Sequence, residues 1–128
     1  MLVALLSKND QFHFWATATL KKLPPLLLTS EAVISELYFL LRNNKRAKQV
    51  ASAMLIGRAV KVVPLAEEID EILKLIEKYE SVPMSYADAA LVRLAEITTN
   101  SVIVTTDADF KIYRFKKNQL VPTIVASP

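Results

Sequence analysis

Hydrophobic positions recur at three- and four-residue spacing along much of the chain, which places their side chains on one face of a helix. The pattern predicts helices over residues 10–22, 30–41, 45–56, 65–79 and 85–98. The Pro24-Pro25 pair ends the first helix, because proline lacks the amide hydrogen that a helix bond requires. Gly57 follows the third helix, and we expect it to end that helix in the left-handed conformation.

Short apolar or β-branched runs separate these helices. They predict strands over residues 26–29, 59–63, 102–105 and 121–125, whereas residues 2–6 fit either a short helix or part of a strand. Strands that alternate with helices favour a parallel sheet with helices on both faces. We therefore predict an α/β protein, a three-layer α/β/α domain in which 59–63 is an edge strand of one sheet.

The composition fits a single domain over residues 1–128. Hydrophobic residues make up 52% of the sequence and charged residues 23%, so the chain can bury a core that offsets its conformational entropy. The absence of cysteine excludes disulfides, thiolate metal sites and thiol nucleophiles. No apolar run reaches the roughly 20 residues of a spanning helix, and residues 2–6 lack the basic leader of a signal peptide. We expect a cytoplasmic protein without membrane contact.

The formal net charge of +3 at pH 7 favours polyanionic partners weakly. Basic residues gather in two runs, over 42–48 and 111–117, and each run fits either a solvated helix face or a phosphate contact. Tyr113 and Phe115 are interleaved with the second run, as in surfaces that stack on RNA bases.

Four carboxylates stand where open parallel sheets bind ligands, after a strand or in a helix beside one. Asp107 and Asp109 follow the predicted strand 102–105, Asp88 lies in the first turn of an apolar helix, and Glu36 interrupts another apolar helix. Converging carboxylates repel one another unless a cation is present, and oxygen ligands suit Mg²⁺ or Mn²⁺. The pattern is typical of a metal site that cleaves phosphodiesters.

Each of these acids also has a purely structural explanation. Ser85 with Asp88, and Thr106 with Asp109, match the spacing of a capping box, in which two residues at a helix start exchange hydrogen bonds. Glu36 fits a solvated position on a helix that is otherwise buried. Both explanations stay open at the level of sequence.

Several stretches resemble the PIN-domain family, and in particular its VapC-like toxins. Residues 83–96, PMSYADAALVRLAE, resemble the most recognisable motif of that family, and residues 102–110, VIVTTDADF, resemble the motif that carries its last acid. Residues 29–36, TSEAVISE, resemble the stretch that ends in its helical glutamate, and residues 2–16 resemble the first helix and the following loop. The resemblance covers nearly the whole chain.

The resemblance implies a function. It places Glu36, Asp88 and Asp107 on catalytic, metal-binding acids and Asp109 on an accessory metal acid. It implies Mg²⁺- or Mn²⁺-dependent cleavage of single-stranded or structured RNA by the toxin of a toxin-antitoxin system. The expected partners are RNA, a cognate antitoxin protein and a second copy of the chain in a homodimer.

One departure from the family concerns the N-terminus. Family members open with a hydrophobic strand that ends in an aspartate, directly before the segment that here begins at Leu2. Relative to that pattern the domain is N-terminally truncated, and the strand would lie at the centre of the sheet. A start codon assigned too far downstream, a true truncation, and a domain that retains binding without catalysis are the explanations. A phosphoacceptor receiver-like domain is a weaker alternative, since it needs the same aspartate.

Overall fold

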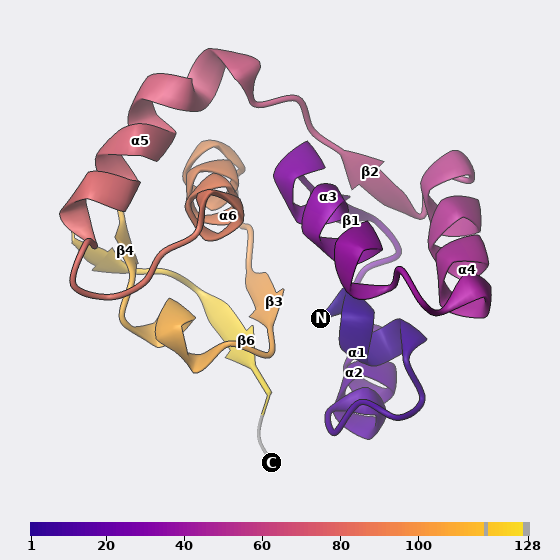
Figure 1. Ribbon diagram of the computed structural model, residues 1–128. Helices are drawn as coiled ribbons and strands as arrows, with labels where there is room; N and C mark the ends of the chain where they lie inside the picture. Colours follow the sequence, from indigo (N-terminus) through magenta and orange to yellow (C-terminus); the bar gives the residue numbers. More distant parts are fainter. Residues whose placement is uncertain (117, 127–128) are drawn as a thin grey trace.

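The computed structural model describes residues 1–116 and 118–126, which form two halves that meet along α3 and α6 (Figure 1). The N-terminal half, residues 1–63, holds α1 (Leu2–Leu6), α2 (His13–Leu20), β1 (Leu27–Thr29), α3 (Glu31–Leu40), α4 (Lys45–Ile56) and β2 (Val60–Val62). The C-terminal half begins at residue 64 and holds η1 (Ala66–Glu68), α5 (Ile69–Lys78), α6 (Tyr86–Ile97), β3 (Ile103–Thr105), η2 (Ala108–Lys111), β4 (Arg114–Phe115), β5 (Gln119–Leu120) and β6 (Thr123–Val125). No helix among these residues is both long and apolar enough to cross a membrane.

Side-chain caps fix where several of the predicted helices begin. Ser30 accepts a hydrogen bond from the Val33 amide at the start of α3, and Asn44 accepts one from the Ala47 amide at the start of α4. The helix predicted over residues 10–22 is shorter than expected, because the Asp10 carboxylate accepts from the Phe12 amide at 2.8 Å and forms a turn there.

The expected left-handed conformation at Gly57 is wrong. Gly57 ends α4 with φ −77° and ψ −1°, which is right-handed backbone, and its amide donates to the Ala53 carbonyl at 2.9 Å. The left-handed residue is the next one, Arg58, with φ 63°. The chain therefore reverses one residue later than the glycine suggests, at a position that carries a side chain.

The parallel pairing of strands is confirmed, but the expected single sheet is not formed among the described residues. β1 pairs in parallel with β2, and β3 pairs in parallel with β6, as two separate two-stranded sheets. β4 and β5 form an antiparallel hairpin that the sequence patterns did not predict. The α/β class is thus correct, whereas its sheet is divided between the two halves.

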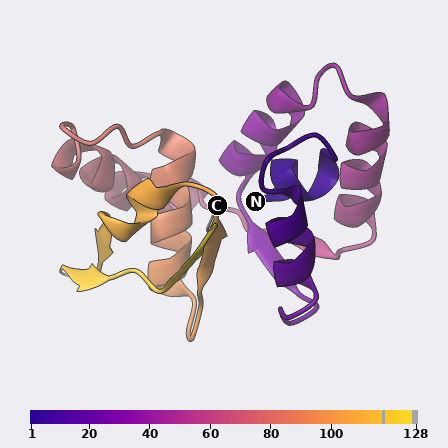
Figure 2. The same ribbon diagram turned by 90° about the horizontal axis from the view of Figure 1, so that it is seen from below.

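The inner edges of the two parallel pairs carry no further strand within the described part of the chain. Leu27 donates its amide hydrogen to Ala59 and the Thr29 carbonyl accepts from Val63, so the backbone of Leu28 is directed to the opposite edge. Figures 1 and 2 show the N-terminus lying between the β1–β2 pair and the β3–β6 pair. The two strand pairs are therefore separated at the place where the N-terminus lies.

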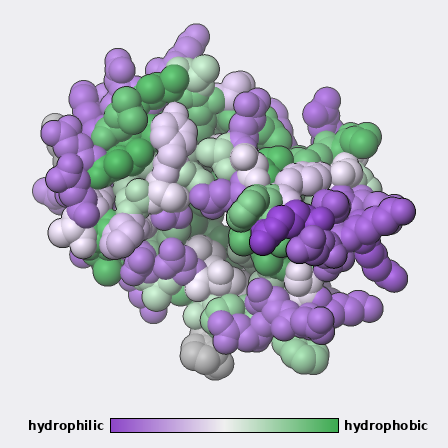
Figure 3. All heavy atoms as spheres, viewed as in Figure 1, coloured by the Kyte–Doolittle hydropathy of each residue, from purple (hydrophilic) through white to green (hydrophobic). Residues whose placement is uncertain are grey.

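The C-terminal half contains the larger core. Its buried cluster joins α5 and α6 to the hairpin and to β3, and its largest fully buried side chains are Tyr113, Phe110, Ile72 and Val92. The core thus holds the helix that carries Asp88 against the strand that leads to Asp107. Some apolar surface remains exposed over α5 (Figure 3), where Ile69 is 44% and Leu73 51% exposed.

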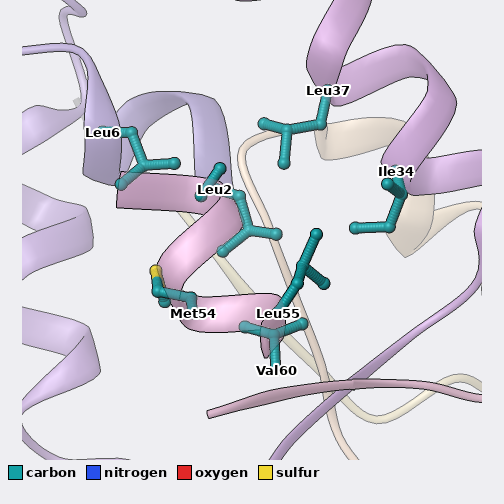
Figure 4. A pocket seen from close by; sticks show the side chains of 8 residues that line it. Leu2, Leu6, Ile34, Leu37, Met54, Leu55 and Val60 are labelled. Carbon is teal, nitrogen blue, oxygen red and sulfur yellow. The ribbon is translucent and has the colours of Figure 1, made fainter. Parts of the chain in front are cut away.

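The N-terminal half has a smaller core, made of Leu37, Leu41, Ala47 and Ala51. Beside it lies an apolar cavity of about 10 Å³ between α1, α3, α4 and β2, shown in Figure 4. A space of this size holds at most one water molecule, and an apolar lining gives a water no partners. The cavity is therefore a packing defect and not a ligand site.

Candidate nuclease site

Asp107 is held at the end of β3 by local hydrogen bonds. Its amide donates to the Thr105 hydroxyl at 3.0 Å, and its carboxylate accepts from the Asp109 amide at 2.9 Å. Asp107 is thus the cap of η2, so the capping box expected for Thr106 and Asp109 is wrong. The short strand and this turn together leave the Asp107 side chain exposed.

Asp88 takes part in the capping box that its spacing with Ser85 predicts. The Asp88 amide donates to the Ser85 hydroxyl at 3.0 Å, and the Asp88 carboxylate accepts from the Ser85 amide at 3.1 Å. The structural explanation of Asp88 is therefore confirmed. It does not exclude a second role, because one bond from Ser85 leaves further lone pairs on the carboxylate.

The charges of two of the acids act on a third, Asp88. Burial raises the pKa of Asp88 above its ordinary value, the bonds from Ser85 act in the opposite direction, and the charges of Asp107 and Asp109 raise it further. Like charges act in this way over several ångströms, so the three carboxylates need not touch. We call Asp88, Asp107 and Asp109 the acidic cluster.

Glu36 stands apart from the acidic cluster in its surroundings. It is exposed on α3, in the other half of the molecule, and its charge is not among those that act on Asp88. Over residues 1–116 and 118–126, no three histidine or acidic side chains lie close enough together to hold a metal ion. Assignment of Glu36, Asp88, Asp107 and Asp109 to one metal centre therefore stays a prediction.

The fit of a divalent cation is incomplete. Carboxylate oxygens are the ligands that Mg²⁺ and Mn²⁺ prefer, so the chemistry of the acidic cluster suits these ions. No three acidic or histidine side chains in the described residues lie close enough together to hold one ion directly. An ion at this site would therefore bind through one or two carboxylates and keep several of its waters.

The expectation that Tyr113 and Phe115 stack on RNA is wrong, because both side chains are buried. Tyr113 has no exposed surface and Phe115 is 8% exposed. Burial, followed by the charges of Asp88, Asp109 and Asp107, raises the pKa of Tyr113 to about 12. The i,i+3 spacing of Phe110 and Tyr113 was the sequence feature that could have placed them in the core.

Arg114 also has a structural role within the second basic run. Its guanidinium donates to the carbonyls of Lys111 at 3.0 Å and Ile112 at 2.8 Å, next to the end of η2. These bonds satisfy carbonyls that a helix end leaves open. Lys111 itself is exposed, so it stays available for a phosphate contact.

Comparisons with known proteins identify the family. The PIN domain matches residues 1–116, and the chain therefore belongs to the PIN-domain family. Among solved structures it is similar to VapC20 of Mycobacterium tuberculosis, a toxin that cleaves the sarcin–ricin loop. The identity is 25%, the TM-score is 0.64, and the match covers 73% of this chain and 76% of that one. No curated protein matches the chain.

The family assignment confirms the resemblance of the sequence to VapC-type members, which are toxin-type nucleases. It also agrees with the position of the acidic cluster, after a parallel strand and in the first turn of the adjoining helix. The class of protein is thereby settled.

Proposed function

We propose that this protein is a metal-dependent endoribonuclease, the toxin of a toxin-antitoxin pair. The observation that carries the proposal is the acidic cluster, in which the like charges of Asp107 and Asp109 act on the half-buried Asp88. Such an arrangement is costly without a cation, and a divalent ion would relieve the repulsion. Membership of the PIN-domain family supports the reaction class.

Asp88, Asp107 and Asp109 would hold Mg²⁺ or Mn²⁺, with Glu36 as a further ligand. When bound, such an ion activates a water and stabilises charge on a phosphodiester during in-line displacement. The chain contributes rigid positions: the capping box orients Asp88, and the turn at β3 orients Asp107. Both carboxylates are thus oriented by hydrogen bonds of their own.

One further carboxylate between β1 and β3 would complete the proposed site. The two inner sheet edges face the region where the N-terminus lies, and one parallel strand there would join them. Burial lowers the pKa of the Met1 amino group, which means that its charge is poorly solvated. A peptide bond at Met1 would carry no charge. A strand added before Met1 would therefore be compatible with the buried position of this nitrogen.

The proposed partners are RNA, a cognate antitoxin and a second copy of the chain, and the proposed location is the cytoplasm. Apolar side chains exposed on the helices support association: Phe39 is 64% exposed on α3 and Ile56 81% on α4. We expect a homodimer or an antitoxin complex. Light scattering that shows a stable monomer at micromolar concentration, alone and with the antitoxin, would contradict this expectation.

A second candidate function is a PIN-domain module that binds RNA or an antitoxin without catalysis. The observation that favours it is the lack of three metal-binding side chains at ligand distance in the described residues. Metal distinguishes the two candidates. If the chain has a nuclease site, Mn²⁺ should bind it and raise the unfolding temperature of the protein. A pure binding module should show no such stabilisation by metal.

The test compares this chain with a version extended before Met1 by a short apolar strand that ends in aspartate. We expect slow or absent cleavage of RNA in Mn²⁺ by the chain itself and faster cleavage by the extended protein. Unstructured RNA and a sarcin–ricin loop oligonucleotide serve as substrates. The control is the same extension ending in asparagine, which supplies the strand without the charge.

Two substitutions in the extended protein complete the test. Asp88→Asn should abolish the gain, because it removes one charge at nearly constant shape. Asp70→Asn, on the exposed first turn of α5, should leave cleavage unchanged. An extended protein that cleaves neither RNA with either metal, or an Asp88→Asn variant as active as its parent, would leave the binding module as the better explanation.

A further inference from the structure

Tyr113 is the side chain that joins the two segments from which the acidic cluster is built. It follows η2, which carries Asp109, and its amide donates to the Asp109 carbonyl at 3.3 Å. Its hydroxyl donates to the carbonyl of Pro83 at 2.9 Å, thirty residues away in the sequence. Pro83 lies two residues before Ser85, the residue that caps α6 and exchanges hydrogen bonds with Asp88.

The ring of Tyr113 is fixed by aromatic neighbours. It packs edge to face against Phe110 and against Tyr79, each at 5.2 Å between ring centres. Tyr113 is fully buried, so neither water nor a bound RNA competes for its hydroxyl. Because the ring is closely packed and has little freedom to move, its hydroxyl keeps the loop at Pro83 in a fixed position relative to η2.

The hydroxyl is also a dependable donor. A tyrosine hydroxyl keeps its proton throughout the neutral range, since its ordinary pKa is about 10. A carbonyl can only accept, and the bond to Pro83 therefore requires this proton.

We propose that Tyr113 is a positioning residue of the acidic cluster, whose hydroxyl holds the loop before α6 and so fixes Asp88 relative to Asp107 and Asp109. The inference rests on the proposed function for its importance to metal binding, while the positional effect is independent of it. Tyr113 touches neither metal nor RNA in this role. It acts through Pro83 and the capping box at Ser85.

The chain offers a matched control in Tyr79. The Tyr79 hydroxyl accepts a bond from the Arg114 amide at 2.7 Å, and Tyr79 belongs to the same aromatic group. Tyr79→Phe and Tyr113→Phe each remove one hydroxyl and keep the ring. The Tyr79 bond is made at the end of α5, four residues before Pro83, whereas the Tyr113 bond holds Pro83 itself, two residues before the Ser85 cap.

The first measurement is amide hydrogen exchange in the full chain, which reports local opening. In Tyr113→Phe we expect exchange at Ser85 and Asp88 to become about fivefold faster, as for the loss of one hydrogen bond. In Tyr79→Phe it should change less than twofold. Pro83→Gly, which loosens the same loop without altering Tyr113, should act in the same direction as Tyr113→Phe.

The second measurement is Mn²⁺ binding to the full chain, followed by paramagnetic broadening of the Asp88 and Asp109 amides. We expect binding several-fold weaker in Tyr113→Phe and unchanged in Tyr79→Phe. Equal exchange at Ser85 and Asp88 in the two tyrosine variants would overturn the inference. If the exchange difference is present but no variant, including the parent, binds Mn²⁺, the inference stands and the proposed function fails.

Discussion

The two halves of the molecule differ in how much apolar side chain they bury. The C-terminal core includes Phe110, Tyr113 and Phe115, whereas the N-terminal core has no aromatic residue and consists of two leucines and two alanines. The acidic cluster stands on the larger core, and Glu36 stands on the smaller one. Three of the four predicted acids are therefore held in place by one well-packed core. The position of Glu36 relative to them depends on how the two halves are joined.

The largest effect that can test this comparison is loss of Phe110. Phe110→Ala removes a fully buried ring from the C-terminal core and should cost about 3–5 kcal/mol of unfolding free energy. Trp15, the only tryptophan, lies in α2 and reports the N-terminal half. In urea, we expect the unfolding midpoint followed by circular dichroism to shift more than the midpoint followed by Trp15 fluorescence. Identical shifts of both probes would mean that the halves unfold as one unit.

A smaller effect is expected in the N-terminal core. Leu37→Ala should cost about 2–3 kcal/mol, at the lower end for a buried leucine, because a small core can collapse more easily around the space. Here Trp15 fluorescence should shift more than the circular dichroism signal in urea. Leu40→Ala, at an exposed position of the same helix, is the control and should change neither midpoint.

Polar contacts of Glu96 also stabilise the C-terminal half. Its carboxylate accepts from the Lys116 amide at 2.8 Å and pairs with Arg93 at 3.4 Å, which ties α6 to the hairpin. Glu96→Gln should cost about 1–2 kcal/mol, since it weakens bonds to a charged acceptor. Urea unfolding measures the effect, and Glu77→Gln on exposed α5 surface should leave the midpoint unchanged.

The smallest expected effect has the opposite sign. The pKa of Asp88 is raised in the folded protein, so ionised Asp88 opposes folding at neutral pH, and this cost disappears as pH falls through the folded pKa towards 3.8. Asp88→Asn should therefore gain less than about 1 kcal/mol at pH 7 and nothing below about pH 4. Urea midpoints at both pH values check it. A gain that persists at low pH would point to a cause other than charge.

Much of the fold was predictable because helices depend on neighbouring residues. The segment 45–56 forms a helix with the predicted bounds, and the Ser85 capping box follows from spacing alone. The interrupted sheet was not predicted, since pairing between distant strands depends on backbone groups that no local pattern specifies. The turn at Arg58 was missed for a related reason: glycine permits the left-handed conformation but does not require it.

The candidate site divides in the same way. Proximity of Asp88 to Asp107 and Asp109 follows from strand ends and helix starts, which a sequence reveals. The burial of Tyr113 does not, because an aromatic residue within a basic run fits a surface as well as a core. Its bond to Pro83 spans thirty residues, so only the three-dimensional structure could disclose it.

The division of the sheet also has a consequence for the order of folding. Each strand pair closes within its own half: β1 meets β2 across α3 and α4, and β3 meets β6 across the hairpin. Both pairings span fewer residues than a contact between β1 and β3 would, so each pair can form without waiting for the other. A strand arriving between β1 and β3 would instead pair with both at once. Its docking would be a late step, governed by the encounter of two preformed units.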